Sequence, residues 1–83
     1  GTPEQAAEAL LMGLRLTEGV DVAALSTRFG LPRAQLVDDA ALARLRDLGL
    51  MWSAGDRIGV ALPGRSLLDA LLADVVADSL VAA

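Results

Sequence analysis

The apolar positions near the start of the chain recur at the spacing of one helix face: i, i+3, i+4 and i+7. They are Ala7, Leu10, Leu11 and Leu14. The segment Thr2–Gln5 before them combines a capping residue, a proline suited to the first helical position and the glutamine of a capping box. We therefore expect a first helix from about Pro3 to Leu16, capped by Thr2. It should stop near Gly19, because glycine readily takes a positive φ.

The next pattern predicts a helix-turn-helix. Asp21 is suited to cap a short helix from Val22 to about Arg28, which Phe29-Gly30 would end. A third, longer helix should follow Leu31-Pro32 and run to about Leu48, closed by Gly49. Its expected buried face comprises Val37, Ala41, Leu45 and Leu48, with Leu36 and Leu42 beside them.

After Gly49 the pattern indicates a β-hairpin. The short apolar segment Leu50–Trp52 is followed by a turn at Ser53–Asp56 and by alternation over Arg57–Leu62. That alternation would put Ile58, Val60 and Leu62 on one face. A hairpin after a helix-turn-helix is a wing. The expected fold is therefore a winged helix, mainly α with a small β-hairpin, forming a single domain over residues 1–83.

A last helix is expected from about Arg65 to Val81, after the break at Pro63-Gly64. Its apolar residues spread over more than half of the helical wheel: Leu67, Leu68, Leu71, Leu72, Val75, Val76 and Leu80. The stripe of a surface helix is normally narrower. Either one side packs on the first helix and the rest is tolerated at the surface, or the helix has a second contact surface. A homodimer through this helix remains open.

Composition supports a covered surface and argues against catalysis. Hydrophobic residues make up 54% of only 83 residues, a surplus over what a small interior buries, so part of it should face a partner. The chain has no Cys, His, Lys or Tyr, and its acids are scattered. It therefore lacks the usual ligands of zinc and iron–sulfur sites and the usual acid–base and nucleophilic groups. We expect no catalytic, metal-binding or cofactor-binding residue in this domain.

The charge pattern disfavours nucleic acid and a membrane span. The net charge is −4, whereas nucleic-acid binders present a basic face. Asp38 and Asp39 would face phosphates if the third helix entered a groove. A DNA-binding winged-helix regulator remains the alternative function, and it would need Arg33, Arg44, Arg46 and Arg57 on one continuous basic face. Asp69, Asp74 and Asp78 interrupt the only long apolar run, so no membrane span is expected.

Gly13, Arg15 and Glu18 are the candidate contact residues. Gly13 lies within an apolar helix, and Arg15 lies between two leucines at its end. In one interpretation, the Arg15 stem lies along the core and its head meets Glu18 or the last helix carbonyls. In the other, Gly13 and Arg15 mark a surface on which another domain or a ligand packs.

The segment from Glu8 to Asp21 resembles the start of the C-terminal domain of the oxygen-independent coproporphyrinogen III oxidase-like proteins. This radical-SAM family includes the haem chaperones, and its pattern is E-x-L-x-x-G-L-R-L-x-x-G-V-D. The matching residues are Glu8, Leu10, Gly13, Leu14, Arg15, Leu16, Gly19, Val20 and Asp21. The resemblance continues through Phe29-Gly30, Leu45…Gly49-Leu50, the hairpin and Pro63-Gly64-Arg65…Leu68-Asp69.

This resemblance implies a non-catalytic accessory domain of a cytoplasmic protein, excised from a longer chain. Its partner would be the N-terminal radical-SAM barrel of the same chain, on or over which it packs. The 4Fe-4S cluster and S-adenosylmethionine would belong to that barrel, with haem as a further candidate ligand of the parent. The parent would be either an oxidase of haem biosynthesis or a haem chaperone.

Overall fold

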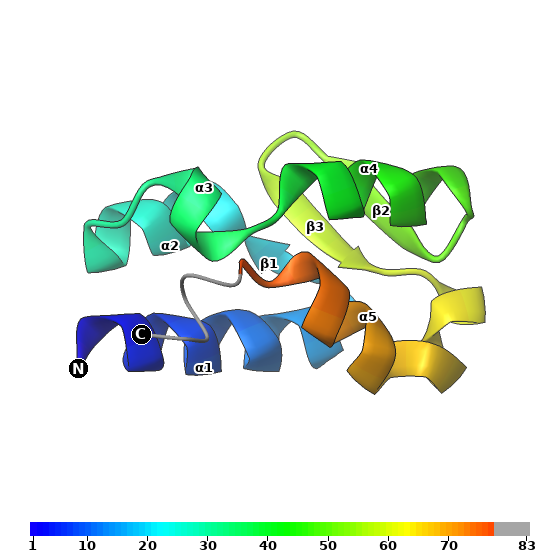
Figure 1. Cartoon of the computed structure of the whole chain (residues 1–83), viewed down its shortest axis with the longest axis horizontal. Coiled ribbons are helices and arrows are strands. Elements are labelled where there is room, and N and C mark those ends of the chain that lie inside the picture. Colours follow the sequence, from blue (N-terminus) through cyan, green and yellow to red (C-terminus); the bar gives the residue numbers. More distant parts are fainter. Residues whose placement is uncertain (78–83) are drawn as a thin grey trace.

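The computed structural model describes residues 1–77, which form a mainly helical domain with one small antiparallel sheet (Figure 1). In chain order the elements are α1 (Thr2–Arg15), β1 (Val20–Asp21), α2 (Val22–Phe29), α3 (Arg33–Leu36), α4 (Asp39–Asp47), β2 (Met51–Ala54), β3 (Arg57–Val60), the 3₁₀ helix η1 (Leu62–Leu67) and α5 (Leu68–Val75). In this part of the chain, no helix is both long and apolar enough to cross a membrane.

The sheet contains the predicted hairpin and one strand that the sequence pattern did not reveal. Its strand order is β1-β3-β2, with Met51 opposite Val60 and Val20 opposite Ile58. Ile58 and Val60 are buried as expected. Leu62 is 86% exposed, so its expected place on the same face is wrong. The reason is that β3 ends at Val60 and the chain turns into η1, where the alternation of a strand no longer applies.

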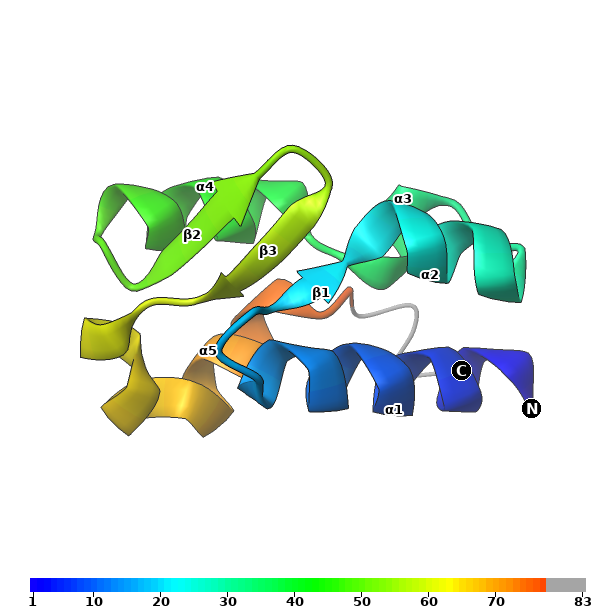
Figure 2. The same cartoon turned by 180° about the vertical axis from the view of Figure 1, so that it is seen from behind.

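The core lies between α1, the sheet and the helices that follow it. Seen from behind in Figure 2, α1 runs along one side of the molecule and β2, β3 and α2 lie on the other. The largest fully buried side chains are Leu10, Leu14, Val22, Leu36, Val37, Ile58 and Val75. Because these come from α1, α2, α3, β3 and α5 as well as from a connecting residue, the core depends on elements from both ends of the described chain.

The caps of the first two helices agree only in part with the sequence analysis. Thr2 does not cap α1: it is the first helical residue, and the Gly1 carbonyl accepts the bond from the Gln5 amide at 3.1 Å. Gly19 has a φ of 72° in the turn after α1, as predicted. Asp21 caps α2 as predicted, since its Oδ1 accepts from the Ala24 amide at 3.0 Å.

The long third helix predicted from about Leu31-Pro32 to Leu48 is wrong, because it is split into α3 and α4. Val37 is extended and pairs with Val76 in an isolated bridge. The Asp38 amide donates to the Val75 carbonyl at 2.8 Å, and the Asp38 carboxylate caps α4 by accepting from Ala41. Val37 and Asp38 are therefore extended rather than helical, because they pair with Val75 and Val76 near the end of the described chain. Leu48 was expected to be buried but is 66% exposed, because α4 ends at Asp47.

The last helix is also shorter than expected. The predicted start at Arg65 is wrong, because Leu62–Leu67 is a 3₁₀ helix and α5 begins at Leu68. The expected end at Val81 is wrong as well: α5 ends at Val75, and the rest of the prediction, with Asp78 and Leu80, lies outside the described residues. Leu71, Leu72 and Val75 are the buried residues of α5, whereas Val76 follows the helix and is buried where it pairs with Val37. Much of the apolar surplus on the expected wheel is thus used in the core.

Candidate interaction surface on the first helix

The three predicted contact residues lie at the C-terminal end of α1 and in the turn after it. The Arg15 side chain is 57% exposed, and its Nη2 lies 3.8 Å from Oδ1 of Asp69 on α5. An exposed ion pair at this distance holds the guanidinium only weakly. Glu18 is exposed in the turn. Within the described residues, the ion pair that Arg15 forms is therefore with Asp69, and the expected pairing with Glu18 is not what the structure has.

Two other arginines bind the carbonyls at this end of α1, a role that sequence reasoning considered for Arg15. Nη1 of Arg65 donates to the Arg15 carbonyl at 2.7 Å. Nη1 of Arg57 donates to the Glu18 carbonyl at 3.1 Å and approaches the Gly19 carbonyl at 3.4 Å. The Arg65 bond satisfies a carbonyl that the helix end leaves unpaired, and the Arg57 bonds satisfy carbonyls of the turn that follows the helix. They fix the backbone of the turn while the side chains of Arg15 and Glu18 point to solvent.

Gly13 has a reason within the fold for being glycine. A Cβ at this position would lie 2.6 Å from the Cβ of Val20, so β1 crosses α1 at a distance that only glycine permits. Gly19 is similarly crowded, since a Cβ there would overlap the backbone carbonyl of Ile58 on β3 and lie 2.9 Å from the indole of Trp52. The two glycines bring β1 and the hairpin close to the end of α1.

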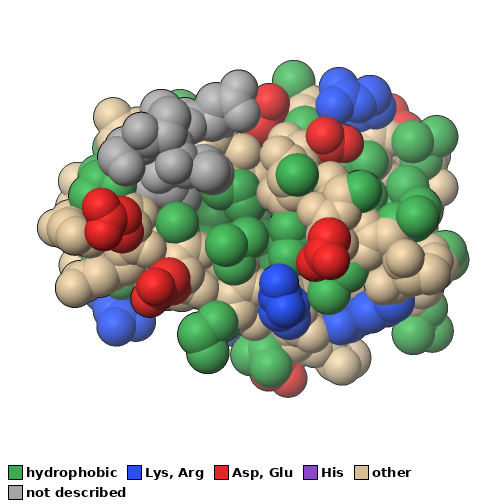
Figure 3. Space-filling model, turned by 60° about the horizontal axis from the view of Figure 1, so that its bottom comes forward, with side chains coloured by type: hydrophobic (Ala, Val, Ile, Leu, Met, Phe, Trp, Pro, Cys, Tyr) green, Lys and Arg blue, Asp and Glu red, His purple; other side chains and the backbone are tan. Residues whose placement is uncertain are grey.

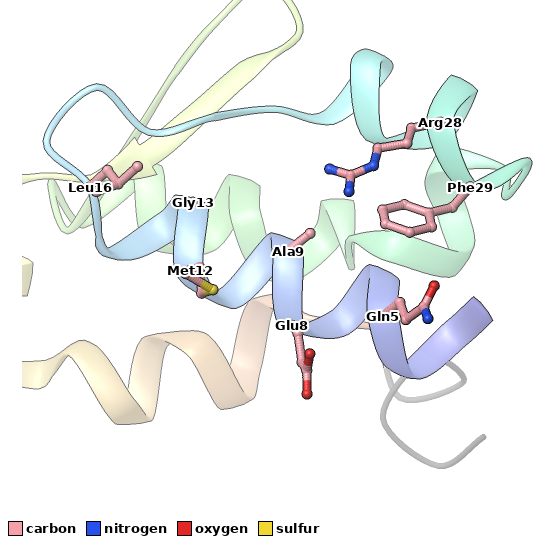
Figure 4. A pocket seen from close by; sticks show the side chains of 8 residues that line it. All are labelled: Gln5, Glu8, Ala9, Met12, Gly13, Leu16, Arg28 and Phe29. Carbon is pink, nitrogen blue, oxygen red and sulfur yellow. The ribbon is translucent and has the colours of Figure 1, made fainter. Parts of the chain in front are cut away.

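A groove of about 660 Å³ runs between α1 and α2 (Figure 4). It is lined by Gln5, Glu8, Ala9, Met12, Gly13, Leu16, Arg28 and Phe29. A neighbouring hollow of about 440 Å³ shares Gly13, Leu16 and Arg28 with it and extends to Glu18 and Arg57. On the other flank of the exposed Met12, a hollow of about 280 Å³ is lined by Glu8, Leu11, Met12 and Arg15.

The groove is mainly apolar, with one charge of each sign. Met12 and Leu16 are 69% and 51% exposed. The Arg28 guanidinium lies 4.9 Å from the centre of the Phe29 ring, a cation–π distance, and both residues come from the end of α2. Glu8 points from α1 away from Arg28 (Figure 4). Figure 3 brings the lower side of Figure 1 forward and shows apolar side chains lying among acidic and basic ones on that side of the molecule. The lining suits the binding of a polypeptide segment.

Three of the four arginines proposed for a DNA-binding face are engaged within the fold. Arg33 makes a bidentate contact with Asp39, at 2.8 to 3.1 Å, and these hydrogen bonds raise the pKa of its guanidinium above the ordinary value. Arg46 donates to the Ser53 hydroxyl at 2.8 Å, and Arg57 donates to the carbonyls of the α1 turn. Their geometry is explained by these intrachain contacts.

Sequence reasoning found part of this surface. It identified Gly13, Arg15 and Glu18 because they interrupt an apolar pattern. It did not identify Met12, Leu16 or Phe29, because apolar residues at helical spacing are ordinarily core. Arg57 and Arg65 left no local signal, since their carbonyl partners lie 38 to 50 residues away in the chain.

Comparison with known proteins agrees with the resemblance stated above. No curated protein and no solved structure matches the chain. The family model described as the HemN C-terminal domain matches residues 2–67, a span that includes Gly13, Arg15 and Glu18 and all elements from α1 to η1. Since this match covers most of the chain, the protein belongs to the HemN C-terminal domain family.

Proposed function

We propose that this chain is a non-catalytic accessory domain of a radical-SAM protein of the oxygen-independent coproporphyrinogen III oxidase-like family. It packs on the N-terminal catalytic barrel of the same chain. The main support is the family match over residues 2–67, since a C-terminal domain has an N-terminal neighbour. The exposed Met12 and Leu16 beside Arg15 supply a surface for that neighbour, because apolar side chains gathered at one place on a surface favour a partner.

We propose a winged-helix architecture for the domain. In its support, one helix precedes a short strand, further helices follow, and a hairpin closes a sheet of order β1-β3-β2. The hairpin of β2 and β3 would be the wing. The helix after the turn at Gly30 has only four residues, and the engaged arginines argue against base readout. This architecture would therefore serve as a packing module.

Gly13, Arg15 and Glu18 are the proposed contact residues. The Arg65 and Arg57 bonds hold the carbonyls of Arg15 and Glu18, so a partner would meet a backbone that is already held in place. The weak pair with Asp69 costs little to exchange for a carboxylate or a carbonyl of the barrel.

The residues of this domain do not fit the role of ligands to the iron–sulfur cluster of such a parent. Iron–sulfur clusters are held by cysteine thiolates, and the sequence has none. In this proposal the 4Fe-4S cluster and S-adenosylmethionine would belong to the barrel of a cytoplasmic parent, with haem as a further candidate ligand. The parent would be either an oxidase or a haem chaperone.

The first test is the reading frame upstream of Thr2. We expect a barrel-length sequence with a CxxxCxxC motif. A short upstream region without cysteines would refute the proposal.

In the full-length protein, Arg15→Glu should speed proteolysis of the interdomain linker, because it reverses a contact charge. Arg44→Glu, at an exposed position of α4, is the matched control and should leave the rate unchanged.

A further inference from the structure

We infer that the pairing between residues 36–38 and residues 75–77 is a clasp, a conformational device that opens as one unit while the rest of the domain stays folded. When it is closed, it orders the ends of three helices. The inference goes beyond the proposed function and does not depend on it. Val37 faces Val76 in the centre of the clasp, and the two segments come from distant parts of the chain.

Two backbone hydrogen bonds close the clasp. The Asp38 amide donates to the Val75 carbonyl at 2.8 Å, and the Ala77 amide donates to the Leu36 carbonyl at 3.1 Å. One antiparallel bridge lies between these bonds. Because both bonds depend on the same bridge, a movement of either segment breaks both of them together.

The clasp lies at the ends of three helices. Leu36 is the last residue of α3, Val75 is the last residue of α5, and Asp38 is the N-cap of α4. Carbonyls in the last turn of a helix have no partner within it, so the clasp supplies partners for those of Leu36 and Val75. Asp38 also places its carboxylate to accept from the Ala41 amide at 3.1 Å. An open clasp would therefore leave two helix carbonyls unpaired and release the residue that caps the third helix.

The clasp joins elements that pack on different neighbours. α3 packs on α1 and α2, whereas α4 packs on β2 and α5. In Figure 1 the end of α5 lies beside the connection between α3 and α4. α3 has only four residues and is too short to be stable by itself. The ion pair between Arg33 and Asp39 also spans the break, but both side chains are partly exposed, so it contributes little.

The order of α3 and of the first turn of α4 thus depends on the clasp. Short helices held by few hydrogen bonds belong to the parts of a protein that open before the core does. The coupling is reciprocal: a contact that holds residues 75–77 in place would order α3, and a contact that moves α3 would loosen residues 75–77.

Native-state hydrogen exchange of the 83-residue chain tests whether the clasp opens as one unit. The amides of Asp38, Ala41 and Ala77 report on the two bonds and the cap, and the amide of Leu10, in the middle of α1, reports on the core. We expect the first three to share one protection factor with a weak dependence on urea, about tenfold or more below that of Leu10. Three different protection factors would overturn the single unit. A common value equal to that of Leu10 would overturn an opening separate from global unfolding.

Asp38→Pro opens the clasp from one side. Asp38 has a φ of −83°, and Val37 before it has a φ of −129° and a ψ of 136°, so proline is compatible with this backbone. The substitution removes the amide and the capping carboxylate. NMR order parameters at Val76 and Ala77 should fall from about 0.85 to below about 0.6, whereas that of Leu10 should stay near 0.85. Asp38→Asn keeps the amide and a capping oxygen and should leave all three unchanged.

Ala77→Pro opens the clasp from the other side, because it removes the amide that donates to Leu36. Val76 before it has a φ of −74° and a ψ of 130°, which also suits a following proline. The order parameters of Val37 and Ala41 should fall below about 0.6. Ala77→Gly keeps the amide and should leave them near 0.85. Equal losses in the glycine and proline variants would assign the effect to the buried methyl group and overturn the clasp.

The two proline variants also test the coupling itself. Rigid Val76 and Ala77 in Asp38→Pro, or rigid Val37 and Ala41 in Ala77→Pro, would show that the two segments move independently and would overturn the inference. Loss of order at Leu10 in either variant would overturn it as well, because the clasp would then be inseparable from the core.

Discussion

At the residue scale, Gly13 joins two roles, because it lies in the groove and also touches β1. An alanine there gains up to about 1 kcal/mol of helix propensity, but its Cβ would lie 2.6 Å from that of Val20. The crowding should outweigh the gain in helix propensity, since both Cβ atoms are fixed to the backbone and no rotamer change can separate them. We expect Gly13→Ala to lower the free energy of unfolding by about 1–3 kcal/mol in urea titrations. Met12→Ala, at an exposed neighbour, should change it by less than about 0.5 kcal/mol. A stabilised Gly13→Ala protein would contradict the close approach of β1.

Arg57 provides a second residue-scale test through the only tryptophan of the chain. The indole of Trp52 lies against Gly19, whose carbonyl accepts from Arg57. Arg57→Ala should loosen the turn after α1, shift Trp52 emission to the red, and cost about 1 kcal/mol of stability. Arg44→Ala is the control and should leave the emission unchanged. An unshifted spectrum for Arg57→Ala would mean that the hairpin holds the turn without this bond.

At the scale of elements, the break between α3 and α4 depends on the Asp38 cap. Its carboxylate accepts from the Ala41 amide at 3.1 Å. Asp38→Ala should therefore lower the free energy of unfolding by about 1 kcal/mol, as for other N-cap replacements, measured by thermal denaturation followed by circular dichroism. Asp47→Ala at the exposed end of the same helix removes a charge without removing a cap and should be neutral or slightly stabilising. Equal losses for the two variants would argue against the cap.

The same break illustrates what the sequence could and could not predict. Local rules correctly predicted α2, the hairpin, and the turns at Gly19, Gly30 and Gly49, because each depends on neighbouring residues. Val37 and Asp38 fit a helical pattern equally well, so the pairing of Val37 with Val76 decided their conformation. The two-residue β1 exists as a strand only through β3, and its own residues give no strand signal.

Of the candidate contact surface, the sequence could predict only the residues that interrupt the apolar pattern of the first helix. Arg15 and Gly13 stand out in an apolar helix, whereas the exposure of Met12 and Leu16 depends on where α2 and α5 lie. Periodicity defines the faces of a helix but not which face a neighbour leaves uncovered. The groove could therefore be placed only with the fold in hand.

At the scale of the whole molecule, the family match and the fold end at different residues. The match covers residues 2–67, yet α5 with Val76 and Ala77 closes the core. Among the described residues beyond the match, the buried side chains are Leu71, Leu72, Val75, Val76 and Ala77. The Ala77 amide also donates to the Leu36 carbonyl at 3.1 Å. The folding unit thus extends beyond the matched segment.

A chain ending at Leu67 should consequently lose cooperative unfolding. It would expose the core faces of α1 and α4 that α5 covers, and burying one leucine or valine is worth about 1.5–3 kcal/mol in a domain whose total stability is about 5–15 kcal/mol. We expect a broad thermal transition by circular dichroism.

Leu72→Asp tests the same contact without shortening the chain and should unfold the domain, because it buries an unpaired charge. Ala73→Asp, one position along on the exposed side of α5, should leave the midpoint within a few degrees. If the shortened chain and Leu72→Asp both unfolded like the intact protein, α5 would be an appendage, and the domain would be complete within the residues that the family model matches.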